Sequence, residues 1–223
     1  MRPITAAEML ELDRKASEFH GLSPQTLMEN AGLAVAEFVA GLVRPSSRIP
    51  ICCGKGNNGG DGLAAARFLA QHGFSPEVFL LEDPQTLKPA AAANYKRLGP
   101  LGVKVQALRL NGDWTAFDES LSACSWVVDA ILGIGTTRPL EEPYLTVVNK
   151  INRSAKRIVA VDIPSGLNAD TGEVCGAAVR ADYTLTLGVS KKGLYAARGP
   201  MLAGQIEIMD IGLPPALLRP FAI

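Results

Sequence analysis

The stretch that decides the fold is Gly54-Lys-Gly-Asn-Asn-Gly-Gly-Asp-Gly62, which lies between a predicted strand over 48–53 and a predicted helix over 63–72. Glycines adopt positive φ angles without steric cost, and they let the backbone come close to a ligand. The helix that follows offers unpaired N–H groups and the positive end of its dipole to an anion. The stretch therefore predicts a phosphate-binding turn between a strand and a helix.

Outward from this turn, strands alternate with helices along the chain. The capping box Thr5-Ala-Ala-Glu8 begins a helix that Gly21 ends, and Ser23-Pro24 begins another, so two helices precede the first strand. Such alternation predicts an α/β fold, a Rossmann-like three-layer sandwich with a mostly parallel sheet and two extra N-terminal helices, in a single domain over 1–223. Further strands are expected over 77–81, 103–108, 125–129, 157–162, 183–187 and 205–210, and helices over 89–98, 115–121 and 144–154.

Composition and charge argue against several classes of protein. The 22 basic and 22 acidic side chains cancel, so the chain lacks the long-range field that draws proteins to nucleic acid. No apolar run has the length of a signal peptide or of a membrane span. We therefore expect a cytoplasmic protein that binds neither nucleic acid nor a membrane. Cys52 and Cys53 are adjacent in a predicted strand, so their side chains should point to opposite faces of the sheet.

Two more loops open at the ends of predicted strands. They are Asp129-Ala-Ile-Leu-Gly-Ile-Gly-Thr-Thr-Arg-Pro139 and Val161-Asp-Ile-Pro-Ser-Gly166. In a parallel sheet all three loops lie along the carboxyl edge, where open α/β sheets bind ligands, so we expect one composite site. Side-chain oxygens of Asn58, Asp129 and Ser165 are available there. Such a set suits a hard cation better than zinc.

The glycine stretch also admits a different interpretation. Gly54, Gly56 and Gly59 satisfy the G-x-G-x-x-G pattern, and Glu82-Asp83 follows the next strand where a ribose-binding carboxylate would stand. A nicotinamide-dependent oxidoreductase is therefore an alternative. Asp61 argues against it, because a carboxylate at the mouth of a pyrophosphate site repels the ligand.

Other chemistries are less well supported. A serine hydrolase based on Ser165 is disfavoured because Ile163 breaks the G-x-S-x-G pattern. His20 and His72 are on predicted helices without partner motifs, so we expect structural or surface roles for them. Lys191-Lys192 follows a strand, and it either brings a cation near a phosphate or forms a solvated charged turn.

Four motifs together resemble a known family. The glycine stretch, the two aspartate loops and the amino-terminal Leu27-Met-Glu-Asn-Ala-Gly32 are similar to those of the NAD(P)H-hydrate epimerases, the YjeF amino-terminal domain family, from about residue 5 to 212. The resemblance implies a Rossmann-like fold that usually dimerises. It also implies interconversion of the R and S forms of hydrated NADH and NADPH (NADHX and NADPHX). A partner dehydratase then restores the cofactor from one of these forms.

The resemblance also assigns residues. A potassium ion would be held by Asn58, Asp129 and Ser165. We expect Asp162 to exchange protons with substrate, because burial at a strand end raises the pKa of a carboxyl group, and Asp61 is the second candidate. Substrate contacts are implied for Asn57, Asn58, Gly59, Gly60, Asp61, Gly133, Ile134, Gly135, Thr136, Thr137, Arg138, Pro139 and Asp162.

Two alternatives stay open at this point. Many family members carry a fused carboxyl-terminal dehydratase domain, which is not part of this sequence, so the chain is either a stand-alone epimerase or a domain of a longer enzyme. Relatives of the fold also serve as non-catalytic scaffolds in messenger-RNA decapping, so a nucleotide-binding scaffold is a second alternative.

Overall fold

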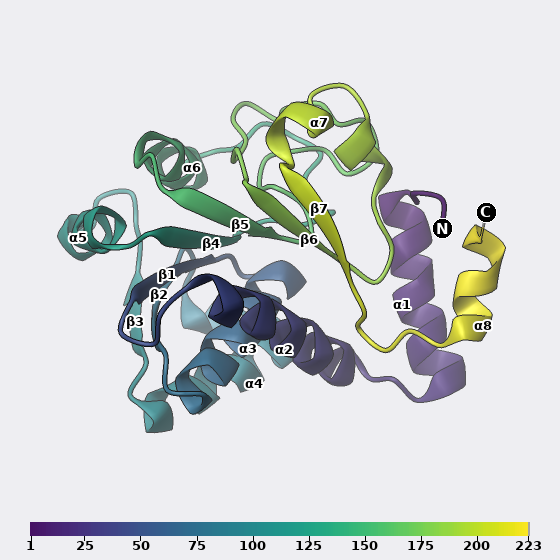
Figure 1. Ribbon diagram of the computed structural model, residues 1–223, viewed down its shortest axis with the longest axis horizontal. Coiled ribbons are helices and arrows are strands. Elements are labelled where there is room, and N and C mark those ends of the chain that lie inside the picture. The colour runs from purple at the N-terminus through teal and green to yellow at the C-terminus, as the bar shows by residue number, and fades with distance from the viewer. Residues whose placement is uncertain (223) are drawn as a thin grey trace.

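A single sheet of seven strands organises the molecule, as Figure 1 shows. The computed structural model describes residues 1–222. Its strand order is β3-β2-β1-β4-β5-β6-β7, and every neighbouring pair is parallel, which confirms the predicted α/β architecture. The order 3-2-1-4-5-6 is that of doubly wound dinucleotide-binding folds, here extended by β7. The strands are β1 Arg48–Cys53, β2 Ser75–Leu80, β3 Lys104–Ala107, β4 Trp126–Ala130, β5 Arg157–Val161, β6 Tyr183–Leu187 and β7 Gln205–Met209.

Helices cover both faces of the sheet and one of its ends. In Figure 1, α2 to α4 lie against one face, α5 and α6 against the other, and α1 stands beside α8 near both termini. Among residues 1–222, no helix combines the length and the apolar character that crossing a bilayer requires. The helices are α1 Ala6–His20, α2 Pro24–Leu42, α3 Asn57–Gln71, α4 Pro89–Leu98, α5 Thr115–Ala123, α6 Tyr144–Arg153, α7 Gly199–Leu202 and α8 Pro215–Leu218, with 3₁₀ turns η1 Pro84–Thr86, η2 Gly99–Leu101, η3 Lys192–Tyr195 and η4 Arg219–Phe221.

The two faces of the sheet have separate hydrophobic cores. Cys53 is buried in the core between the sheet and α2 to α4, whereas Cys52 is buried in the core beneath α5 and α6. This confirms that the adjacent thiols point to opposite faces, as the period of two along a strand requires.

The glycine stretch differs from its prediction in one respect. Helix α3 begins at Asn57, not at residue 63, so most of the stretch is the first turn and a half of a helix. Among residues 1–222, no glycine of the stretch has a positive φ, so the stretch does not use the conformational freedom that glycine allows. Close packing explains the glycines instead, because a Cβ on Gly62 would lie 2.5 Å from that of Ala130 and 2.9 Å from the sulfur of Cys53.

The Leu27–Gly32 motif has a structural explanation. Glu29 accepts hydrogen bonds from the guanidinium groups of Arg67 on α3 and Arg97 on α4, the latter at 2.8 Å. The Asn30 side-chain amide donates to the carbonyl of Ile211, beyond β7, at 2.8 Å. Together these contacts hold α2 against α3, α4 and the segment that follows β7, and so fix the walls around the end of the glycine stretch.

Helix α1 is attached to the carboxyl edge of the sheet. The predicted capping box is present, with the Thr5 hydroxyl accepting from the backbone of Glu8 and the Glu8 carboxylate accepting from that of Thr5. Just before it, Ile4 donates to the carbonyl of Ser190 at 2.8 Å and accepts from the backbone of Lys192 at 2.9 Å. These bonds place α1 across the loop that follows β6.

Candidate functional site

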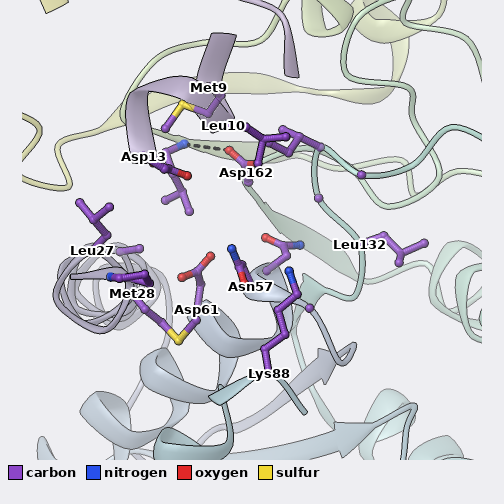
Figure 2. Close-up of a pocket in the computed structure, with 18 of the residues that line it drawn as sticks. Met9, Leu10, Asp13, Leu27, Met28, Asn57, Asp61, Lys88, Leu132 and Asp162 are labelled. Atoms are coloured by element: carbon purple, nitrogen blue, oxygen red, sulfur yellow. Dashed lines mark hydrogen bonds between the residues drawn. The ribbon is translucent and has the colours of Figure 1, made fainter. Parts of the chain in front are cut away.

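One cavity of about 820 Å³ opens at the carboxyl edge of the sheet, beside the ends of β1, β4, β5 and β6. The strand order reverses between β1 and β4, and this is where doubly wound sheets bind ligands. The volume is within the range of small-molecule sites. Helices α1 and α2 form an apolar wall, and the strand-end loops form a polar one (Figure 2). The apolar wall contains Met9, Leu10, Leu27, Met28 and Ala31.

Most of the predicted site residues line this cavity, but some do not. Gly60 packs against Met28, and Gly59 against the carbonyl of Gly54, so both contact the protein's own atoms. Residues 137–139 are exposed and lie outside the cavity lining. The predicted residues that line the cavity are Asn57, Asn58, Asp61, Gly133, Ile134, Gly135, Thr136 and Asp162.

Asp162 follows β5 directly and has a left-handed backbone, with φ at +68°. Its Oδ1 accepts hydrogen bonds from the Lys191 ammonium and, at 3.2 Å, from the backbone of Leu187. Within residues 1–222, no hydrogen bond uses its Oδ2, which lies 3.5 Å from where a Cβ on Gly133 would stand. One oxygen is therefore held by the protein, and the other is free to meet a ligand.

Lys191 is the partner that sequence reasoning missed. The solvated charged turn is wrong for this residue, because Lys191 is fully buried and lines the cavity, whereas Lys192 is exposed. The Lys191 ammonium donates to Asp162, to the Leu187 carbonyl at 2.7 Å and to the Thr186 hydroxyl at 3.3 Å. Two lysines after a strand carry no sequence signal that would separate the buried one from the solvated one.

Asp61 and Asp13 complete the acid–base groups of the cavity. Burial raises the pKa of Asp61 well above its usual range; the negative charges of Asp162 and Asp13 act in the same direction, and Lys191 opposes them. Asp61 therefore keeps its proton to a higher pH than a free aspartate does. Burial also raises the pKa of Asp13, on α1, to about 6. Sequence reasoning missed Asp13 because it belongs to none of the strand-end motifs.

A second corner of the cavity is suited to an anion. The first N–H groups of α3 have no partner within the helix, and its N-cap, Gly56, provides no side-chain cap. Lys55 and Lys88 also line the cavity. Lys55 lies 3.4 Å from Glu82, whereas Lys88 forms no ion pair within residues 1–222, and Figure 2 shows it beside Asn57. Helix dipole and ammonium groups together favour a phosphate at this corner.

Two of the three predicted cation ligands, Asp129 and Ser165, belong to one buried hydrogen-bond network, and the third, Asn58, lies beside it. Asp129 accepts from Ser165 twice, from the hydroxyl at 2.6 Å and from the backbone at 2.8 Å. Burial raises the pKa of Asp129 to about 6, although these hydrogen bonds oppose the shift. The Ser165 hydroxyl in turn accepts from Leu132, whose neighbour Gly133 adjoins Asn58.

The side chain of Asn58 decides whether a cation fits. Its amide oxygen and nitrogen are both buried, and neither has a hydrogen-bond partner within residues 1–222. A buried amide without partners is costly unless a ligand supplies the missing contact. The described residues contain no cluster of three histidine, cysteine or acidic side chains, so a zinc-type site is absent from them. Amide, carboxylate and hydroxyl oxygens fit a hard monovalent or divalent cation.

The acidic pair that suggested a dehydrogenase is engaged in internal contacts. Glu82 accepts a hydrogen bond from the hydroxyl of Tyr144, and Asp83 caps η1 and lies 3.4 Å from Arg109. Neither carboxylate lines the cavity. Both histidines of the chain are exposed and outside the cavity, in agreement with surface roles.

The fold and the cavity together define an α/β protein with an acid–base site and an anion-binding corner at the switch point of its sheet. The particular family follows from comparison with known proteins. Residues 24–193 match the family model described as YjeF-related protein N-terminus, and the chain belongs to this family, which confirms the resemblance found in its motifs.

Relatives of two lengths match the chain. The "NAD(P)H-hydrate epimerase" of Rhodopirellula baltica is 36% identical over 99% of this chain and 88% of its own length. The "Bifunctional NAD(P)H-hydrate repair enzyme Nnr" of Thermofilum pendens is 42% identical over 98% of this chain, which spans only 42% of that relative. The crystal structure of yeast ynu0, YNL200c, is similar over 90% of this chain and 86% of its own, with a TM-score of 0.78 and 26% identity.

Proposed function

We propose that this chain is an NAD(P)H-hydrate epimerase, which interconverts the R and S forms of hydrated NADH and NADPH. The observation that carries the proposal is the pair of carboxyl groups in one cavity, a buried Asp61 with a raised pKa and an ion-paired Asp162 with one free oxygen. Similarity to proteins named as epimerases over nearly their whole length supports it.

The chemistry needs one proton donor and one proton acceptor. The hydrated ring has a hydroxyl on the carbon beside its ring nitrogen. In one route the C–O bond breaks, the ring nitrogen lone pair forms a C=N bond, and the hydroxyl leaves as water after taking a proton. Water then adds to the other face and gives up a proton. In the other route the hydroxyl loses its proton as the ring C–N bond breaks towards nitrogen, which takes a proton, and closure reverses these steps.

Asp61 and Asp162 fit these two roles in either route. The pKa of Asp61 is raised because the group is buried beside other carboxylates, which suits it to the role of the acid. Asp162 has its charge balanced by Lys191, and its free Oδ2 acts as the base. The phosphates of the substrate would lie at the start of α3, near Lys55 and Lys88.

A coupled assay tests this function. The purified chain is added to the R form of the hydrate together with an excess of a dehydratase specific for the S form, and recovery of NADH is followed. We expect recovery faster than spontaneous epimerisation, and a loss of about a hundredfold or more of this acceleration in Asp162→Asn. Asp118→Asn, on the exposed side of α5, is the matched control with full activity.

The outcomes separate the alternatives. No acceleration by the unmodified chain, combined with tight binding of the hydrate, would support the non-catalytic scaffold. Reduction or oxidation of an added substrate by intact NAD would support an oxidoreductase. Full activity in Asp162→Asn would remove Asp162 from the role of base.

We also propose that the site binds potassium through Asn58, Asp129 and Ser165. The unpartnered amide of Asn58 beside an oxygen-rich network supports this. The ion would supply positive charge that orients the strand-end loops. Potassium chloride should raise the Tm more than an equal concentration of sodium chloride, and Asn58→Ala should abolish that difference. Equal Tm values in the two salts would contradict a potassium site.

Two partnerships complete the proposal. The chain is expected to act with a dehydratase, since relatives that are 42% and 41% identical to it are named bifunctional repair enzymes. It is also expected to form a homodimer, as the family usually does. Light scattering after size-exclusion chromatography measures the mass in solution, and a monomer at assay concentrations would contradict the dimer.

A further inference from the structure

Asp13 is a carboxyl group of the cavity that has no role in the proposed reaction. Asp13 projects from α1 into the same space as Asp61 and Asp162, as Figure 2 shows. Asp61 and Asp162 are each 8% exposed, whereas Asp13 is half-buried and more accessible to solvent. These three carboxyl groups share the cavity with one buried ammonium group, that of Lys191, and Glu18 is a fourth, exposed carboxyl group of the lining.

This ratio of charges limits how many of the acids ionise. Three carboxylates beside one ammonium would leave two uncompensated negative charges in a region of low dielectric, which favours protonation of the others once Asp162 is paired. Burial raises the pKa of Asp13 to about 6, with Lys191 lowering it and Asp162 raising it. Other ionisable groups that line the cavity are Arg14 and Glu18 on α1, Lys55 and Lys88 in loops, and Tyr144 at the start of α6.

In the dehydration route, in which water leaves one face and adds to the other, a completed turnover leaves Asp61 and Asp162 in the wrong protonation states, whereas ring closure in the other route would restore both. Asp61 has given up a proton and Asp162 has gained one, so the proton must move from Asp162 to Asp61 before the next substrate reacts in the same direction. Both groups are buried, and this slows direct exchange with bulk solvent. Asp13 is a third acid, more accessible to solvent, whose charge interacts with those of both Asp162 and Asp61, so it is suited to returning the proton.

We propose that Asp13 is the proton relay of this site, carrying the proton from Asp162 back to Asp61; this role rests on the proposed epimerase function. The proton of the Asp162 carboxylic acid passes to the Asp13 carboxylate, and Asp13 then passes it to the Asp61 carboxylate, through solvent in the outer part of the cavity. No other bond changes and no electrons are transferred. The amino-terminal helix thus contributes a residue to the reaction.

The test is Asp13→Asn in the coupled assay at saturating substrate, with a series of imidazole or acetate concentrations. We expect kcat to fall about tenfold or more, KM to change by less than about twofold, and the small buffers to restore kcat in proportion to their concentration. Glu11→Gln, on the same helix and outside the cavity lining, is the control and should keep the kcat of the unmodified chain.

Two kinds of failure are distinguishable. If the unmodified chain shows no epimerase activity, the proposed function fails and the relay falls with it. If the unmodified chain is active and Asp13→Asn retains its kcat, or loses it without rescue by either buffer, the relay alone is overturned. Circular dichroism and the Tm of each variant show whether α1 stays folded, and a folded variant rescued by buffer supports the relay.

Discussion

Replacing Lys191 by methionine removes the positive partner of a buried carboxylate while keeping most of the side-chain volume. Lys191 is fully buried and donates to Asp162, Leu187 and Thr186. Removing one member of a buried ion pair costs about 3–5 kcal/mol, because the other charge stays buried without compensation. For a domain of this size that loss corresponds to a fall in Tm of about 6–20 °C.

The double variant makes the argument quantitative. In Lys191→Met with Asp162→Asn neither charge remains, so most of the lost stability should return, and the two substitutions should be strongly non-additive. Asparagine tolerates the left-handed backbone at position 162, so the single Asp162→Asn variant isolates the charge. Urea unfolding of the four proteins at pH 7 measures the free energy of unfolding and closes the cycle.

A neighbouring lysine provides the control. Lys192 is exposed, and Lys192→Met should change the free energy of unfolding by less than about 0.5 kcal/mol. The reasoning would be refuted by a loss below about 1 kcal/mol in Lys191→Met, or by single effects that simply add in the double variant. Either result would mean that the Asp162 carboxylate does not depend on Lys191 for compensation.

Three further expectations concern packing, pH and thiol reactivity. Gly62→Ala should lower the free energy of unfolding by about 1–3 kcal/mol, because the new methyl group meets the sheet. Gly41→Ala, with open space around it, should raise the free energy of unfolding by up to about 1 kcal/mol, and equal effects of the two substitutions would contradict the packing argument. The folded chain holds a proton on Asp13 up to about pH 6, whereas the unfolded chain releases it near pH 4. This contribution to the free energy of unfolding is therefore complete below about pH 4 and is lost as the pH rises through about 6. The Asp13→Asn variant should lack this pH dependence, and the same pH profile in both proteins would contradict it. Burial raises the pKa of the Cys53 thiol, so iodoacetamide should modify the partly exposed Cys175 first in the folded chain, and prior modification of Cys53, detected by mass spectrometry, would contradict its burial.

Local signals explain where sequence reasoning succeeded. Helix 89–98 and strand 183–187 coincide with α4 and β6, because a proline begins the helix and β-branched residues fill the strand. The start of α3 was misplaced because several glycines in a row have poor helix propensity. Contacts with Met28, Ala130 and Cys53 override that propensity, and none of them is visible within the local stretch.

The proton-exchanging groups were likewise predicted only in part from the sequence. Asp61 and Asp162 were predicted from motifs at strand ends, whereas Asp13 and Lys191 were not assigned to the site. The structure raises the pKa of Asp61 by burial, and it pairs Asp162 with the buried Lys191, a contact that the motifs did not indicate. An ion pair between residues that are distant along the chain leaves no periodic pattern in the sequence.

The sequence by itself determined which loops form the site. Alternating strands and helices require parallel crossovers, and parallel strands place all of their carboxyl ends at one edge, so the glycine stretch and both aspartate loops had to meet there. Only the tertiary structure decided which carboxyl group is buried beside other acids and which is paired with an ammonium group. That choice depends on burial and on neighbouring charges, here Asp13 from α1 and Lys191 after β6, which meet only when the chain is folded.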